Sequence, residues 1–281
     1  MMENAMKRKL FCEYGPICYR ISVIKENLKR RLCDLCGDAS FAAEKSDLPL
    51  AVIVKSHTSP LLRRLSGVDE ALQRQKGVNI RLACAKIHGL LIRPGETFSF
   101  WRTVGAPTKR HGYVPGLVIG SGRKLSEGVG GGLCQLANLT HWMVLNSPLT
   151  VTELHHHSDA LFPDDRRRVP FGTGTSVFYN YVDYRFRNDT DQMVQLLLWV
   201  EEETLCGELR SEAPFPCRYR LIEENSHFRK EEDGYYRISR VSREVIDRAS
   251  GEVLRRETVL DNHSRVMYDP KLIPSDEIRD F

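Results

Sequence analysis

The stretch Glu127-Gly-Val-Gly-Gly-Gly-Leu-Cys-Gln-Leu-Ala-Asn-Leu-Thr-His-Trp-Met-Val-Leu-Asn146 joins a glycine-rich turn to an apolar segment. Apolar residues recur in the segment at the three- and four-residue spacing of an amphipathic helix, and Pro148 lies just past its expected end. Residues 149–154 follow with the pattern of a strand. The stretch therefore predicts a helix that starts at Cys134 and is followed directly by a strand.

Beyond this helix the sequence is dominated by patterns typical of strands. They cover residues 177–187, 193–200, 205–210, 217–223, 235–246 and 253–260, with turn-forming pairs or runs at 188–191, 206–207, 233–234 and 250–251. A doubly wound parallel sheet would need repeated strand–helix alternation, which the last hundred residues lack. We predict an α+β fold in which the Cys-bearing helix packs on a largely antiparallel β-sheet.

Three regions are expected along the chain. Residues 1–46 form a basic helical segment, because apolar residues recur at helical spacing between Cys18 and Leu35. Residues 47–212 form the core domain, with strands expected over 50–55, 90–93 and 96–101 and a helix over 78–88. Residues 213–281 form a β-rich C-terminal extension.

Composition excludes several classes of protein. The 281 residues are 41% hydrophobic and 28% charged, which is ordinary for a globular protein rather than a disordered chain or a collagen-like fibre. The net charge of +4 is too small to indicate a nucleic-acid partner. No window resembles a membrane span or a signal peptide, and eight scattered cysteines suit a reducing compartment. A cytoplasmic location is expected.

The glycine turn could present Cys134 as a nucleophile. Gly130, Gly131 and Gly132 permit unusual backbone conformations and close approach of a substrate. A cysteine in the first turn of a helix lies at the positive end of the helix dipole, which lowers its pKa, and free N–H groups there can stabilise an oxyanion. The alternative is a structural turn with Cys134 as a small buried residue. A phosphate-binding loop is not expected, because the glycine turn lacks the Gly-Lys-Ser/Thr ending of such loops.

The run Glu153-Leu-His155-His156-His157-Ser158 supplies candidate bases for Cys134. On a strand, His155 and His157 point to one face and His156 to the other. Three adjacent histidines could also bind a metal, but no fourth ligand is evident nearby. Cys33 and Cys36 form a single CxxC motif, and no second pair of cysteines follows at the spacing of a zinc site. We therefore expect neither a metal nor another cofactor.

Four motifs in order resemble the VanW family, which takes its name from a protein of vancomycin B-type resistance clusters. They are Pro94-Gly-Glu-Thr-Phe-Ser-Phe-Trp101, Gly130-Gly-Gly-Leu-Cys-Gln-Leu136, Glu153-Leu-His-His-His-Ser158 and Val182-Asp-Tyr-Arg-Phe-Arg-Asn188. The resemblance runs from about residue 45 to the C-terminus. This resemblance implies a role in glycopeptide resistance or peptidoglycan metabolism.

Some multidomain extracellular relatives in this family are understood to act as L,D-transpeptidases through the family cysteine. The resemblance thus implies that Cys134 accepts an acyl group, with His155 or His157 as the base. Where the family has an Asp, this chain has Gly174. Asp183 is then the remaining carboxylate that could orient the base.

The same resemblance implies a peptidoglycan-type peptide or precursor as partner. Residues expected to bind it are Gly130, Gly131, Gly132, Gln135 and Trp101. Phe98 and Phe100 of the first motif are expected in the core instead. The alternative function is a non-catalytic module that binds such a peptide, or a partner, through the same groove.

Overall fold

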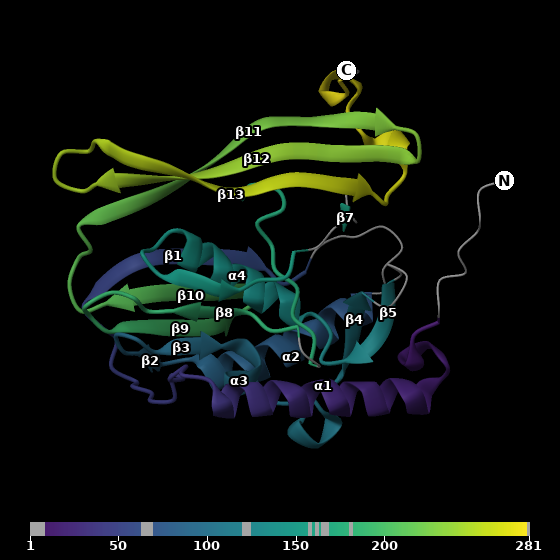
Figure 1. Cartoon of the computed structure of the whole chain (residues 1–281), viewed down its shortest axis with the longest axis horizontal. Helices are drawn as coiled ribbons and strands as arrows, with labels where there is room; N and C mark the ends of the chain where they lie inside the picture. Colours follow the sequence, from purple (N-terminus) through teal and green to yellow (C-terminus); the bar gives the residue numbers. More distant parts are fainter. Residues whose placement is uncertain are drawn as a thin grey trace.

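The structure is a computed structural model that describes residues 9–62, 70–119, 125–156, 159–160, 163, 169–179 and 182–279 (Figure 1). Helices and three small sheets make up the lower body in this view, and a sheet of long strands lies above them. The N-terminal helix runs along the lower edge of the body.

Three sheets build the lower body. The largest has the order β1-β10-β9-β2, with every neighbouring pair antiparallel. Its strands are β1 (Val52–Pro60), β2 (Leu90–Ile92), β9 (Val194–Glu201) and β10 (Thr204–Ser211). The second has the order β3-β8-β6 and consists of β3 (Thr97–Ser99), β6 (Thr150–Glu153) and β8 (Arg185–Arg187). The third is a hairpin of β4 (Pro115–Ile119) and β5 (Leu125–Val129).

The helices frame these sheets. They are α1 (Pro16–Cys36), α2 (Glu70–Ile87), α3 (Phe100–Val104) and α4 (Leu133–Leu145), with short 3-10 turns η1 (Phe11–Glu13), η2 (Lys109–His111), η3 (Pro270–Leu272) and η4 (Ser275–Glu277). Helix α4 packs on β1 and β10. Gly207 of β10 allows this close approach, because a Cβ there would lie 2.5 Å from Leu139 Cδ2 and 3.0 Å from Met143 Cε.

The upper sheet has the order β11-β12-β13-β7. Its long strands are β11 (Cys217–Glu231), β12 (Gly234–Asp247) and β13 (Val253–Val266), and β7 (Asp159–Ala160) pairs parallel to β13. A small apolar cluster under this sheet contains Ala160, Phe171, Phe228, Val266 and Ile273. The main core lies in the lower body and includes the fully buried Phe98, Phe100 and Tyr184.

The observed elements confirm the predicted α+β class, with the Cys-bearing helix on a largely antiparallel sheet. The strand expected over 96–101 is wrong in part, because Ser99 ends β3 and caps α3 by accepting a hydrogen bond from Arg102 N at 3.3 Å. Among the described residues between 177 and 187, a named strand is formed only by Arg185–Arg187. The turn expected at 206–207 lies inside β10, and the chain turns after β9 instead, with Glu202 at φ +51°.

The turn expected at 188–191 joins strands of two different sheets, so it does not form a hairpin. The turns at 233–234 and 250–251 do link neighbouring antiparallel strands. Three long strands follow residue 213, but the domain boundaries near 46 and 212 stay predictions.

Candidate functional site

The glycine turn that leads into α4 is closely packed. Gly130 and Gly132 have φ of +81° and +93°, a backbone region that favours glycine. A Cβ at Gly130 would lie 2.7 Å from Pro107 Cβ, and one at Gly132 would lie 2.0 Å from Lys76 Cγ. Buried Asn79 donates from Nδ2 to Gly131 O at 3.0 Å and so ties the turn to α2. The turn has a fixed shape that the expected glycines make possible.

Cys134 occupies the first turn of α4, as predicted, but its thiol does not have the expected electrostatics. The side chain is partly buried and packs against the main core. Its Sγ donates to Val177 O at 3.6 Å. Burial raises the pKa of the thiol, more than hydrogen bonding to the backbone lowers it. The lowered pKa expected from the helix dipole is therefore wrong, and the thiol form is favoured at neutral pH.

The histidine run follows β6. His155 Nε2 lies 3.0 Å from Glu153 Oε1, and its backbone oxygen accepts from Ser176 N at 2.7 Å. Exposed His156 turns to Gly172 O at 3.2 Å. His157 lies outside the described residues. The pairing of Cys134 with His155 or His157 stays a prediction.

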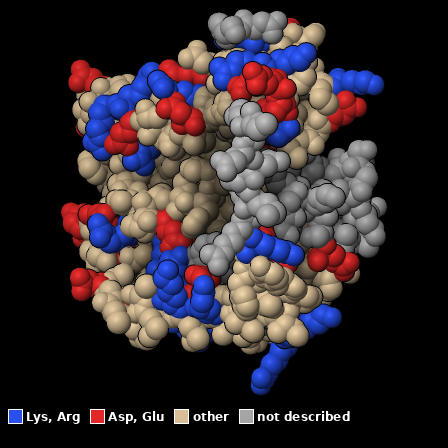
Figure 2. All heavy atoms as spheres, turned by 45° about the vertical axis from the view of Figure 1, so that its right-hand side comes forward, with Lys and Arg blue, Asp and Glu red and all other residues tan. Residues whose placement is uncertain are grey.

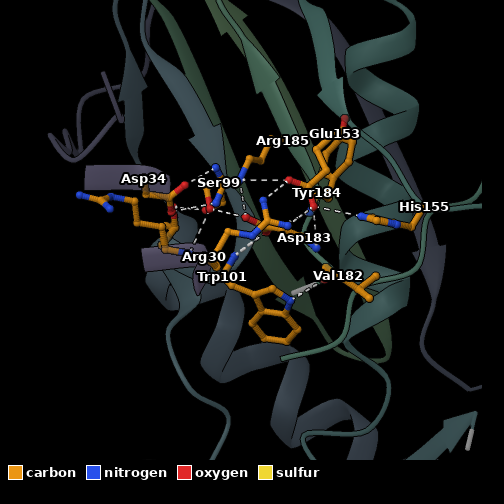
Figure 3. Close-up of polar contacts among 12 residues, drawn as sticks. Arg30, Asp34, Ser99, Trp101, Glu153, His155, Val182, Asp183, Tyr184 and Arg185 are labelled. Carbon is orange, nitrogen blue, oxygen red and sulfur yellow. Dashed lines mark hydrogen bonds and ion pairs between the residues drawn. The ribbon is translucent and has the colours of Figure 1, made fainter. Parts of the chain in front are cut away.

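Asp183 is the centre of a buried hydrogen-bond network (Figure 3). Its Oδ2 accepts from Ser99 Oγ at 2.5 Å and from Arg185 Nε at 2.8 Å. Its Oδ1 accepts from the backbone N–H groups of Trp101 at 3.0 Å and Tyr184 at 2.9 Å. These contacts join β3, α3 and β8. The proposed orientation of a catalytic base by Asp183 stays a prediction, and the carboxylate bonded to His155 is Glu153.

Two bidentate ion pairs attach α1 to this network. Arg30 donates from both terminal nitrogens to Glu153, each at 2.6 Å. Arg185 donates to both oxygens of Asp34 at 2.6 and 2.9 Å. Burial alone would raise the pKa of Glu153, but hydrogen bonds from Arg30 and His155 outweigh it and lower the pKa. Burial would likewise lower the pKa of Arg185, but Asp34 and Asp183 raise it.

A pocket of about 400 Å³ lies between α1 and the core beside these ion pairs. Trp101 and Tyr179 form an aromatic part of its wall, with ring centroids 5.4 Å apart. Trp101 Nε1 donates to Val182 O at 2.9 Å, which fixes the indole in place. Arg31 and Arg102 also line the pocket, and neither forms an ion pair with an acidic residue in the described part of the chain. The pocket can therefore accept an anionic group.

The other predicted binding residues lie elsewhere. Gln135 donates from Nε2 to Ser59 Oγ and Pro60 O, both at 2.8 Å, so its amide links α4 to β1. Trp101 is the predicted binding residue that lines the pocket, whereas the glycine turn is absent from its lining. A side chain at Gly174 would lie 3.3 Å from Asn138 Oδ1, one helical turn along α4 from Cys134.

Sequence reasoning missed several residues of this site. Glu153 had a usable signal, because it lies only two residues before His155 in the sequence. Arg30 and the pair of Arg185 with Asp34 gave no such signal, since the partners in these two pairs are more than a hundred residues apart along the chain. His141 of α4 was also missed; it is buried beside Tyr184, with Nδ1 3.1 Å from the hydroxyl oxygen. Burial lowers the pKa of His141 to about 3, so the imidazole is neutral.

No group of three or more potential metal-ligating side chains occurs in the described ranges. Cys33 and Cys36 are exposed free thiols near the end of α1, and all eight cysteines of the chain are free. None of the described helices is both long and apolar enough to cross a membrane.

Comparison with known proteins finds a similar family. The model described as VanW like protein matches residues 75–210. The Vancomycin B-type resistance protein VanW of Enterococcus faecalis is 28% identical over 244 residues, covering 85% of this chain and 88% of that protein. The chain is therefore similar to the VanW family.

The Uncharacterized protein YoaR of Bacillus subtilis is 32% identical over 121 residues, or 43% of this chain and 38% of YoaR. No solved structure matches the chain significantly. The stretch matched by the VanW model contains Cys134, Glu153, Asp183 and Arg185, whereas α1 lies before it.

Proposed function

We propose that this VanW-like chain acts in glycopeptide resistance or peptidoglycan metabolism by binding a peptidoglycan-type peptide or precursor in the pocket under α1. The similarity to a protein named for vancomycin resistance supports the cellular role. The pocket between α1, α3 and β8 is the observation that supports the binding role.

The pocket chemistry suits a peptide that ends in a carboxylate. Arg102 projects from α3, and its guanidinium stacks 4.4 Å from the centroid of the Phe41 ring. Arg31 enters from α1. A guanidinium presents several N–H donors in a planar fork that matches a carboxylate. Trp101 and Tyr179 offer flat apolar surface beside these cations for the rest of the peptide.

Isothermal titration calorimetry with a stem peptide tests this binding. The peptide with free carboxylates should bind, and the same peptide with amidated carboxylates should bind more weakly. Arg102→Glu should weaken binding about tenfold or more, because a charged hydrogen bond contributes about 1.5–3 kcal/mol. The matched control is Arg218→Glu, an exposed arginine of β11 remote from the pocket lining. Equal affinities for the two variants would contradict the proposal.

A second candidate function is acyl transfer by Cys134, favoured by its place in the first turn of α4 directly after the glycine turn. The sulfur would attack a peptide carbonyl and form a thioester as the amine leaves. His155 or His157 would take the thiol proton and pass it to the leaving amine. Because the pKa of the thiol is raised, this step depends on such a base.

Mass spectrometry separates the two functions. A transferase incubated with muropeptides should gain an acyl adduct on Cys134, and Cys134→Ser should abolish the thioester. The thiol should also react with iodoacetamide near pH 6 faster than Cys217, a partly buried cysteine outside the site. An unmodified Cys134 with ordinary reactivity would leave peptide binding as the function.

A cytoplasmic location is part of the proposal. The eight free cysteines support it, because such thiols persist in a reducing compartment. Fractionation of cells that express the chain, with thiol labelling before lysis, tests this location.

A further inference from the structure

Helix α1 exposes its apolar face. Six large aliphatic side chains are between 50% and 77% exposed, namely Ile17, Ile21, Ile24, Leu28, Leu32 and Leu35. Their spacing of three or four residues places them in one continuous stripe along the helix. A stripe of this length is unusual on a free surface, because globular proteins normally turn the apolar side of a helix toward the core.

The opposite face of α1 is the one that meets the body of the protein. Arg30 and Asp34 make the two bidentate ion pairs there, and Asn27 lines the pocket. No residue of α1 is fully buried. Figure 1 shows α1 along the lower edge of the body. Polar contacts thus hold the helix so that its apolar stripe faces outward.

Basic side chains flank the stripe on both sides. Arg20 and Arg31 lie along one side, where Arg31 also lines the pocket, and Lys25 and Lys29 lie along the other, each three or four residues from members of the stripe. All four are exposed. Lys25 contacts Glu26 at 2.9 Å.

The exposed face of α1 carries no acidic residue. Of the two acidic residues of the helix, Glu26 is partly buried and pairs with Lys25, and Asp34 is partly buried in its ion pair with Arg185. Elsewhere basic and acidic side chains are intermixed on the face in Figure 2. The outer side of α1 is therefore apolar along its centre and cationic along its edges.

We propose that α1 lies flat on an anionic membrane surface. An apolar stripe with lysine and arginine at its edges matches a bilayer interface, where aliphatic chains enter the lipid and the cations meet lipid phosphates. The helix is too polar to span the bilayer. A second copy of the chain fits less well, because two stripes packed together would oppose their basic edges. This inference does not rest on the peptide-binding proposal.

The segment before α1 also exposes apolar and aromatic side chains. Leu10, Phe11 and Tyr14 are exposed by 63%, 55% and 65%. Lys9 Nζ lies 5.2 Å from the centroid of the Tyr14 ring. Aromatic side chains next to cations are frequent at the level of lipid headgroups.

Co-sedimentation of the full chain with lipid vesicles tests the proposal. Vesicles of phosphatidylcholine and phosphatidylglycerol in equal amounts should pellet the chain, and vesicles of phosphatidylcholine alone should pellet much less. Leu28→Asp should lower the partition coefficient about tenfold or more, because the substitution puts a charge where the leucine side chain enters the lipid. Lys29→Glu should reduce binding and its dependence on salt.

Leu254→Asp is the matched control, since Leu254 on β13 is 55% exposed and Leu28 is 54% exposed. It should bind vesicles as the unmodified chain does. Thermal melting of each variant shows whether the fold is kept. Equal binding by Leu28→Asp and the control, or no binding of the unmodified chain to anionic vesicles, would overturn the proposal. The proposal would also be overturned if the unmodified chain did not bind vesicles but formed a dimer that Leu28→Asp dissociates.

Discussion

Replacing Asp183 by Asn tests whether its buried network holds β3, α3 and β8 together. The carboxylate accepts four hydrogen bonds, two at each oxygen. An Asn side chain has one oxygen, which can keep the two backbone donors. Its amide then faces Ser99, whose hydroxyl can reverse and accept, and Arg185, which cannot.

The loss is therefore one charged hydrogen bond and the charge that pairs with Arg185. A charged hydrogen bond contributes about 1.5–3 kcal/mol, and breaking a buried pair adds to this. Because Arg185 keeps Asp34, we expect a loss of about 2–4 kcal/mol in the free energy of unfolding. At about 2–4 °C per kcal/mol, the melting temperature should fall by on the order of 10 °C.

Urea unfolding followed by tryptophan fluorescence measures this loss. The control is Asp189→Asn, which removes the exposed pair of Arg187 Nε with Asp189 Oδ1 at 2.5 Å. Exposed pairs contribute about 0–1 kcal/mol, so the control should unfold almost as the unmodified chain does. If Asp183→Asn were no less stable than the control, the network would not contribute as reasoned above.

Three further outcomes are expected. Stability should decrease as pH falls below 6.5, by up to about 1.4 kcal/mol per pH unit, because unfolded chains protonate His141 while burial keeps its folded pKa near 3; calorimetry of His141→Asn should show a shallower slope. Gly132→Ala should cost about 1–3 kcal/mol in a urea titration, since the new methyl group would meet the Lys76 side chain in a left-handed backbone region; an unchanged midpoint would contradict this. Arg30→Ala should speed tryptic cleavage within α1. In the unmodified chain, the protection of α1 amides from hydrogen exchange should fall as pH drops below the ordinary Glu value of 4.5, because the lowered pKa of Glu153 makes the attachment complete above that value and weakens it as the carboxylate is protonated; unchanged protection would mean that other contacts hold α1.

Periodic elements could be predicted from the sequence, because local spacing sets them. Helices α1 and α4 and the long strands of the upper sheet were identified in this way. The stretch from 177 to 184 has a strand-like pattern, but backbone oxygens in it accept hydrogen bonds from side chains that are distant in the sequence. The backbone oxygen of Val177 accepts a hydrogen bond from the thiol of Cys134, and the backbone oxygen of Val182 accepts one from the indole of Trp101.

The candidate site was predictable only in part. The first-turn position of Cys134 and the pocket position of Trp101 follow from short motifs. The pKa of the thiol was predicted in the wrong direction, because sequence shows the helix start but not the burial around it. The attachment of α1 joins Arg30 to Glu153, which are 123 positions apart in the sequence, and no local pattern encodes such a distant pair.

The pocket has walls of different origin along the chain. One wall comes from Asn27 to Asp34 of α1, and the facing wall comes from α3 and β8 within the stretch that the VanW model matches. Since α1 buries no side chain of its own, its pocket-facing residues can change without disturbing the core. Ligand preference can therefore change while the rest of the fold is kept, provided that a substituted helix keeps the two ion pairs.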